Sequence, residues 1–376
     1  MKGAINLKTM FSTALFFILS IAFAMNAAAF WPDAAMNEVT TIAGTGSHGA
    51  WDGGISQFNL PMAVIGDGQG GFIVADTFNN LIRHISGDGE VTTAAGVIFG
   101  IASDNFPTGS YIDGPMHEAG FWRPTGIAKP FGGGLFIADS ENNAIRVIME
   151  GIVYTVAGGL NAGYASGGPH EARFNMPGAV AMHPDGYVYV ADTGNHVIRR
   201  ISPDGYTVTI AGQGGSAGYY NGLAAHALFD GPMGITISPD GRIFVADTGN
   251  HLIRVIENGI VSTLAGTRSF IEADGWELYP IGGFFDGLPG EAMFDQPIGI
   301  ALWGEYLIVA DSANHSIRVV SPDGEVRTLT GTGEPGSVFG AAGIASFHFP
   351  MGVYVYGNSL IIADTGNNMI RALNLN

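Results

Sequence analysis

The sequence predicts an all-β fold, a six-bladed β-propeller whose blades are four-stranded antiparallel sheets. Three observations lead to this prediction. The chain has 376 residues, of which 58 are Gly, and the glycines are spread among apolar segments, as in a protein with many tight turns. One short segment recurs six times along the chain. Around each recurrence lie four short apolar or β-branched runs, the pattern of four-stranded sheets repeated around a ring.

The recurring segment spans a strand end, a turn and the start of the next strand. All copies carry an Asp after an apolar run and an Arg seven positions later. The copies are IVADTFNNLIR (73–83), FIADSENNAIR (136–146), VADTGNHVIR (190–199), VADTGNHLIR (245–254), IVADSANHSIR (308–318) and IIADTGNNMIR (361–371). An Asp at a strand end can accept hydrogen bonds from backbone N–H groups of the following turn. The Arg is predicted to pair with a carboxylate between strands.

These two positions are predicted to be structural. They are Asp76, Asp139, Asp192, Asp247, Asp311 and Asp364, with Arg83, Arg146, Arg199, Arg254, Arg318 and Arg371. Three copies read Asp-Thr-Gly, the motif of aspartic proteases, but protease catalysis needs two carboxylates that share one site. Six repetitions of one geometry fit a structural turn better, so no catalytic residue is predicted.

The third copy shows the four strands of one unit. Its strands are predicted at 179–183, 187–192, 197–202 and 206–212. Pro-Asp-Gly separates the first two, and the same tripeptide returns at 239–241, where Gly supplies the positive φ that a turn needs.

The two ends of the chain are predicted to meet in one blade. After Asp364 the chain supplies a third strand, 369–374, and then ends. The segment EVTTIAG (38–44) closely matches EVTTAAG (90–96), the fourth strand of the first unit. We therefore expect strand 38–44 to complete the last blade and to remove the edges that an open array would expose.

The six copies resemble the NHL-repeat family, named after the Asn-His-Leu found here at Asn250, His251 and Leu252. The resemblance covers nearly all of residues 38–376. It implies a six-bladed propeller in which the repeated turn joins the second and third strands of each blade. It does not imply one activity, because this fold hosts scaffolds, RNA-binding proteins, lyases and lactonases.

The N-terminus predicts export. Lys2 and Lys8 precede an apolar run, and Ala27 to Ala29 offer a small-residue cleavage site. We expect residues 1–29 to be a signal peptide, 30–37 a short linker and 38–376 a single propeller domain. The mature protein is then secreted or periplasmic, without a membrane segment after cleavage. The alternative is an uncleaved anchor.

Composition limits the partners. The chain has no Cys, which excludes a disulfide framework in an exported protein. Its formal net charge is −18, and beyond the first 29 residues the only lysine is Lys129. A phosphate-binding surface needs clustered cations, so nucleic acid is not an expected partner. We expect a monomer.

Two connectors break the regular spacing. From the Gly that ends a fourth strand to the next motif Asp, the chain takes 43 residues before Asp139 and 45 before Asp311, against 32 to 35 elsewhere. The insertions, 97–114 and 267–287, enter blades 2 and 5 on opposite sides of the ring. We expect them to face each other across the mouth of the central channel. The predicted ligand-binding face comprises Phe106, Tyr111, Asp113, Asp274, Trp276, Glu277, Tyr279, Phe285 and Asp286, which are aromatic or acidic. These aromatic side chains could instead only pack their own loops onto the propeller.

Histidines offer a metal hypothesis. His117, His170 and His226 each precede the Phe that starts a unit, and they are the candidates for a metal site. Equivalent points on adjacent blades are generally too far apart for one zinc ion, whose nitrogen ligands lie about 2 Å away. We therefore expect no cofactor, with Ca²⁺ or Zn²⁺ as the alternative.

The predicted function is that of a binding or scaffold module. The expected partner is a peptide, a protein or a glycan that meets the inserted face. The alternative is a metal-dependent hydrolase or lyase, lactonase-like or amidating-lyase-like, with its site at the mouth of the central channel.

Overall fold

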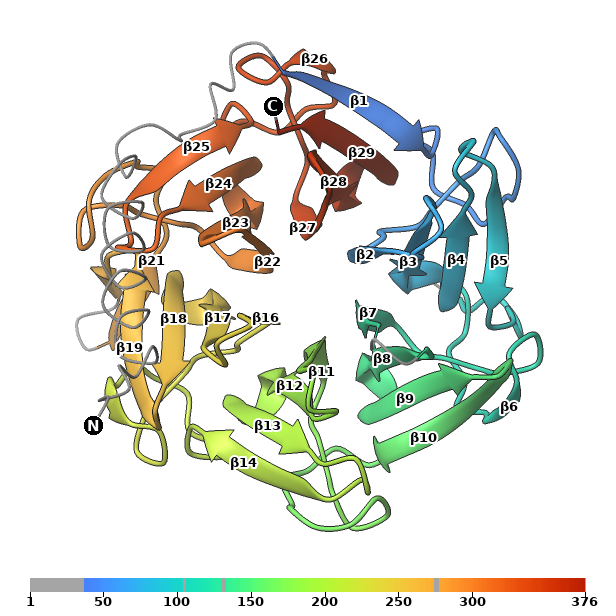
Figure 1. Cartoon of the computed structure of the whole chain (residues 1–376), viewed down its shortest axis with the longest axis horizontal. Coiled ribbons are helices and arrows are strands. Elements are labelled where there is room, and N and C mark those ends of the chain that lie inside the picture. The colour runs from blue at the N-terminus through green and yellow to red at the C-terminus, as the bar shows by residue number, and fades with distance from the viewer. Residues whose placement is uncertain (1–36, 104–105, 130–132, 274–276, 376) are drawn as a thin grey trace, which may run out of the picture. The chain divides into compact units, whose positions relative to one another are not determined.

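All described strands except those of one hairpin form six antiparallel sheets arranged as blades around a central channel, as Figure 1 shows. The computed structural model describes residues 37–103, 106–129, 133–273 and 277–375, apart from the side chains of 270–279. Within these residues no helix is long and apolar enough to cross a membrane. The prediction of a six-bladed β-propeller is confirmed.

Each blade runs from the channel outward in chain order. Blade 1 contains β2 (Ala63–Gly66), β3 (Phe72–Asp76), β4 (Leu81–Ile85) and β5 (Val91–Ala95). Blade 2 contains β7 (Pro124–Ala128), β8 (Leu135–Asp139), β9 (Ala144–Met149) and β10 (Ile152–Gly158). Blade 3 contains β11 (Pro177–Met182), β12 (Val188–Asp192), β13 (Val197–Ile201) and β14 (Thr207–Ala211).

The second half of the ring has the same order. Blade 4 contains β16 (Gly234–Ile237), β17 (Ile243–Asp247), β18 (Leu252–Glu257) and β19 (Ile260–Ala265). Blade 5 contains β22 (Pro297–Trp303), β23 (Tyr306–Asp311), β24 (Ser316–Val320) and β25 (Val326–Thr330). Blade 6 contains β27 (Pro350–Tyr356), β28 (Ser359–Asp364), β29 (Met369–Asn374) and β1 (Glu38–Ala43).

Short elements complete the blades. A two-residue strand extends blades 2, 4 and 6 at the outer edge: β6 (Gly114–Pro115), β15 (Gly222–Leu223) and β26 (Gly340–Ala341). The insertion before blade 5 forms the hairpin β20 (Ser269–Ala273) and β21 (Glu277–Ile281). The repeated turns are single 3₁₀ turns: η2 (Thr77–Asn79), η3 (Ser140–Asn142), η4 (Thr193–Asn195), η5 (Thr248–Asn250), η6 (Ser312–Asn314) and η7 (Thr365–Asn367).

Strand β1 closes the ring. It pairs antiparallel with β29, so that Val39 lies opposite Leu373 and Thr41 opposite Arg371. In Figure 1 this strand, in blue, lies beside the last strand of the chain, in dark red. The predicted completion of the last blade by the N-terminal strand is therefore confirmed, and the two ends of the propeller are held in one sheet.

The core lies between neighbouring blades. One core cluster joins Ile198 of blade 3 to Phe229 and Val245 of blade 4, and equivalent clusters fill other seams between blades. The connector entering each blade contributes one fully buried Phe: Phe58, Phe121, Phe174, Phe229, Phe294 and Phe347. Hydrophobic burial along these seams stabilises the ring.

A hydroxyl group links each turn to the next blade. The Thr or Ser that follows the motif Asp donates a hydrogen bond to a Pro carbonyl at the start of the next innermost strand. The pairs are Thr77–Pro124, Ser140–Pro177, Thr193–Pro232, Thr248–Pro297, Ser312–Pro350 and Thr365–Pro61. The last pair joins blade 6 to blade 1 and completes the circle. Sequence reasoning missed this role, although every copy has Thr or Ser there.

The Asn or His that ends each turn makes a second link. Its side-chain Oδ1 or Nδ1 accepts the N–H of the residue just before that Pro, at 2.8–3.0 Å. The donor residues have φ between +46° and +52°, an unfavourable conformation for all but Gly231; the others are Leu60, Arg123, Met176, Gln296 and Phe349. Because Asn Oδ1 and His Nδ1 can both accept this hydrogen bond, the two residue types interchange in the repeat.

Candidate functional site

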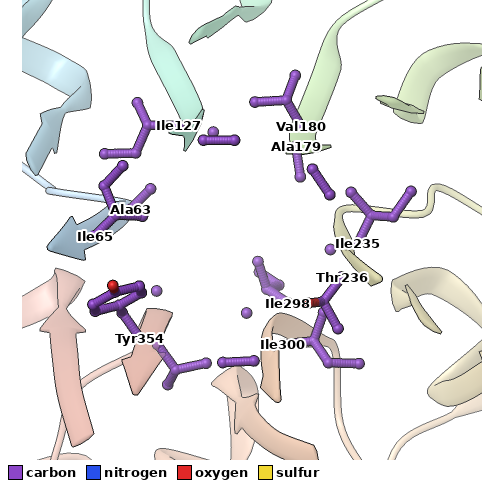
Figure 2. A pocket seen from close by; sticks show the side chains of 18 of the residues that line it. Ala63, Ile65, Ile127, Ala179, Val180, Ile235, Thr236, Ile298, Ile300 and Tyr354 are labelled. Atoms are coloured by element: carbon purple, nitrogen blue, oxygen red, sulfur yellow. The ribbon is translucent and has the colours of Figure 1, made fainter. Parts of the chain in front are cut away.

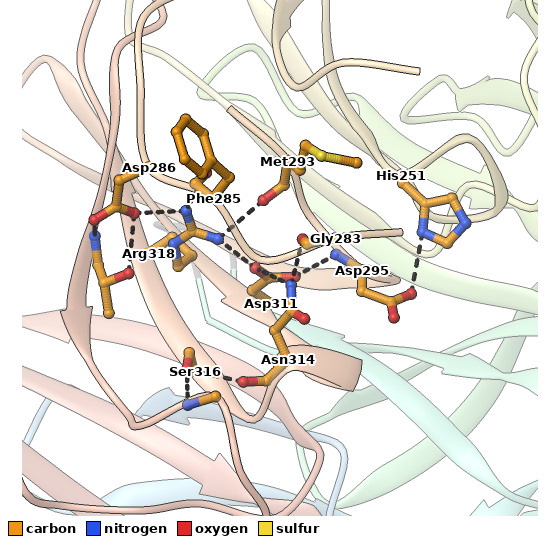
Figure 3. Close-up of polar contacts among 12 residues, drawn as sticks. His251, Gly283, Phe285, Asp286, Met293, Asp295, Asp311, Asn314, Ser316 and Arg318 are labelled. Carbon is orange, nitrogen blue, oxygen red and sulfur yellow. Dashed lines mark hydrogen bonds and ion pairs between the residues drawn. The ribbon is translucent and has the colours of Figure 1, made fainter. Parts of the chain in front are cut away.

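The repeated Asp is a structural centre in every blade, and Figure 3 shows the copy in blade 5. Asp311 is fully buried; its Oδ2 accepts from Arg318 at 2.6 Å and from Asn314 at 2.9 Å. Its Oδ1 accepts the N–H of Asp295 at 2.7 Å. That N–H belongs to the preceding connector, whereas we had expected an N–H of the following turn. The carboxylate therefore fixes the connector to the blade.

The repeated Arg is fully buried and lies between aromatic rings. The Arg318 guanidinium lies 4.9 Å from the ring centre of Phe284 and 5.3 Å from that of Phe294. Burial raises the pKa of Asp311 to about 6, against the opposing effect of Arg318. At neutral pH the pair is thus ionised and has every carboxylate oxygen hydrogen-bonded, which a buried charge requires.

Two residues of the predicted ligand-binding face complete this arrangement. Asp113 pairs with Arg146 at 2.5 Å, and Asp286 pairs with Arg318 at 2.6 Å. Both carboxylates also accept from a Thr on the outermost strand of their own blade. Asp52 makes the same contacts in blade 1, where the connector has no insertion. Their contacts are therefore part of the blade.

The aromatic residues of the predicted face differ in their surroundings. Tyr111 lies 4.9 Å from the Arg146 guanidinium and shares a hydrogen bond with Thr155. Phe285 exposes its side chain while its carbonyl accepts from Arg318. Phe106 lies edge-on against Phe78 of η2. Asp274 and Trp276 lie outside the described residues, and of Glu277 and Tyr279 only the backbone in β21 is described.

The candidate metal-binding histidines are not brought together. His117, His170 and His226 are exposed and belong to the connectors of three different blades. Over the part of the chain that the structure describes, no three His, Cys, Asp or Glu side chains gather around one point.

The central channel contains a cavity of about 300 Å³, which Figure 2 shows from close by. The innermost strands β2, β7, β11, β16, β22 and β27 line it, and none of the described side chains of the predicted face does. The placement of the two insertions at the mouth of the channel stays a prediction. This volume is at the small end of the range for ligand pockets in proteins.

The lining side chains are mainly apolar in all six blades, with backbone groups supplying most of the polar surface. The described residues of the lining are Gly, Ala, Val, Ile, Leu and Met, together with three polar side chains, those of Thr125, Thr236 and Tyr354. Among the described lining residues there is no Asp, Glu, His, Lys or Arg, so this part of the lining carries no ionised side chain at neutral pH. The arrangement suits an uncharged guest and offers no carboxylate or imidazole for acid–base chemistry or metal ligation.

Six four-stranded blades around a channel define the class of a six-bladed β-propeller. Residues 174–201 and 229–256 match the family model described as NHL repeat. The chain is 31% identical over 280 residues to Protein SUPPRESSOR OF QUENCHING 1, chloroplastic, of Arabidopsis thaliana, covering 71% of this chain and 26% of that protein. It is 34% identical over 161 residues to NHL repeat-containing protein 2 of Gallus gallus, covering 38% and 22% respectively. The structure is therefore a six-bladed β-propeller in which two segments match the NHL repeat, and NHL-repeat proteins are among its relatives.

The chain spans about a quarter of the length of these two relatives. Among solved structures it is similar to an auxiliary nutrient binding protein from Bacteroides ovatus, with a TM-score of 0.64 and 16% identity, over 90% of this chain and 76% of the other. It is also similar to a gluconolactonase from Xanthomonas campestris, with a TM-score of 0.55 and 15% identity, over 91% and 92%. At these identities the likeness concerns the fold.

Proposed function

We propose that this protein is a binding module that takes a small, uncharged and mainly apolar ligand into its central channel. The apolar lining of the cavity carries the proposal. Six blades supply the same kind of side chain, so the apolar character extends around the whole channel. An apolar group that leaves water for such a cavity gains roughly 25 cal/mol for each Å² removed from water.

The lining favours binding over metal-dependent hydrolysis. A metal site in the channel would need carboxylate or imidazole ligands, and the described lining supplies neither. The structural neighbours include both a nutrient-binding protein and a gluconolactonase, so the fold alone is compatible with both functions. The side chains of this channel support the first.

The proposed module acts outside the cytoplasm. The basic start and apolar run of the N-terminus support export. Recovery of the protein in a periplasmic or culture fraction, beginning near Phe30, would support this location, and retention in the cytoplasm would count against it.

A channel-filling variant tests the proposal. Ile298 projects into the cavity, as Figure 2 shows, and Ile298→Trp should occupy space that a ligand needs. With ethylbenzene as the probe, calorimetry should detect one site in the parent protein, with an affinity at least tenfold lower in the variant.

Ile260→Trp is the matched control, because Ile260 is exposed on the outer strand β19. It should bind the probe as the parent does. Equal binding by Ile298→Trp, or the absence of binding of both ethylbenzene and benzyl alcohol to the parent protein, would refute a ligand site in the channel.

A further inference from the structure

The polar groups of the channel lining are not equivalent. Thr125 donates from Oγ1 to the carbonyl of Gly178 at 2.8 Å and shares a hydrogen bond with Ser140, so its hydroxyl is engaged between blades 2 and 3. Within the described chain, no hydrogen bond is recorded for Tyr354 Oη or Thr236 Oγ1. Two hydroxyl groups of the cavity are therefore free to bind a ligand.

The two free hydroxyl groups belong to one level of the channel. Thr236 pairs with Phe244, three positions before the motif residue Asp247, and Tyr354 pairs with Ile361, three positions before Asp364. Because the six innermost strands are equivalent, residues with the same register lie at the same height along the channel. The other four blades carry Ile65, Ala128, Ala181 and Ala301 there. This level thus combines two hydroxyls with four apolar side chains.

A glycine makes room for the tyrosine. A Cβ atom added at Gly66 of the neighbouring blade 1 would lie 3.0 Å from Tyr354 Oη and 3.0 Å from its Cε1. At the equivalent position the other blades carry a larger side chain: Lys129, Met182, Ile237, Leu302 and Val355. Gly66, which has no side chain, thus leaves space for the phenol ring of Tyr354 in the neighbouring blade.

The side chains at this level of the channel favour one class of ligand. Both Tyr and Thr hydroxyls can donate and accept, so each can hydrogen-bond a hydroxyl group of a ligand. The described lining has no charged group to balance an ionic ligand. A ligand with an apolar body and a single hydroxyl group can hydrogen-bond one of these two hydroxyls and place its apolar part against the other side chains of the lining.

We propose that the channel selects a small alcohol or phenol whose hydroxyl group hydrogen-bonds at the level of Tyr354 and Thr236. The inference rests on the proposed function, because it names the ligand class of the same cavity. It assigns Tyr354 and Thr236 as specificity-determining residues and Gly66 as the residue that positions the tyrosine.

Two probes of matched shape test this selection. Benzyl alcohol and ethylbenzene differ in one hydroxyl group in place of one methyl group. In the double variant Tyr354→Phe with Thr236→Val, calorimetry should show about threefold to tenfold weaker binding of benzyl alcohol, the range for one net hydrogen bond. Binding of ethylbenzene should stay unchanged or become tighter, because the variant removes only polar groups.

The same substitutions away from the channel provide the control. Tyr356 is exposed and packs edge-on against Phe72, and Thr92 is exposed on the outer strand β5. The variant Tyr356→Phe with Thr92→Val should bind both probes as the parent does. Thermal unfolding of each variant reports whether the propeller remains folded.

The outcomes separate the two proposals. Unchanged binding of benzyl alcohol to the double variant, or equal losses for both probes, would overturn hydroxyl selection and leave the channel as an apolar site. Failure of the parent to bind either probe would overturn the proposed function, and hydroxyl selection with it. A loss confined to benzyl alcohol supports both.

Discussion

At the scale of single residues, the buried Asp–Arg pair makes a large contribution to the stability of each blade. In blade 4 Asp247 and Arg254 are fully buried and lie 2.5 Å apart. Burial raises the pKa of Asp247 to about 6, and Arg254 is the main opposing influence. Removing the cation by Arg254→Leu would leave a buried carboxylate without its countercharge. We expect a loss of about 3–5 kcal/mol in the free energy of unfolding, measured by urea denaturation.

An exposed pair is the control for this change. Arg242 pairs with Asp240 at 3.0 Å near the surface, and exposed pairs contribute about 1 kcal/mol or less. Arg242→Leu should therefore cost far less than Arg254→Leu. Similar losses in the two variants would contradict a special role for the buried pair.

At the scale of elements, the links between blades predict how stability depends on pH. At the seam between blades 5 and 6, His315 Nδ1 accepts the N–H of Phe349 at 3.0 Å. Burial, and then the nearby His348, lower the pKa of His315 below its usual 6.5. The unfolded chain therefore binds a proton more readily, so this residue stabilises the fold above about pH 6.5, and the contribution is lost as pH falls below that value.

Replacing the histidine by the residue of the other blades isolates this effect. His315→Asn keeps a hydrogen-bond acceptor but cannot be protonated. Acidification from pH 7.5 to 5.5 should therefore lower the free energy of unfolding of this variant by about 1 kcal/mol less than that of the parent. The buried motif aspartates act in the opposite direction, because their raised pKa favours the folded state as pH falls below about 6. Both proteins contain them, so the difference reports on His315. In the control variant His170→Asn, at an exposed histidine, acidification should lower stability as much as in the parent. The same loss in His315→Asn would contradict the role given to His315.

At the scale of the whole molecule, closure of the ring depends on β1. Val39 is fully buried between Leu373 of β29 and Gly340 of β26. Val39→Asp would place a carboxylate in that apolar environment, so we expect a loss of about 3 kcal/mol or more and faster proteolysis of blade 6. Thr40→Asp, on the exposed face of the same strand, is the control and should leave both measurements near those of the parent. Equal protease resistance in the two variants would show that β1 is dispensable.

The six units, their strands and the closure by residues 38–44 could all be predicted from the sequence, because turns and strands depend on neighbours close in the chain and on a repeated pattern. The sequence also identified the Asp and Arg of each turn, since six copies made them visible. Only the tertiary structure decided what these and the connector residues contact. Thr365 meets Pro61 across 304 positions, and Asp113 and Asp286 meet buried arginines in their own blades. The channel likewise depends on six strands spread from residue 62 to residue 355, and no local pattern shows that Thr236 and Tyr354 share one level there.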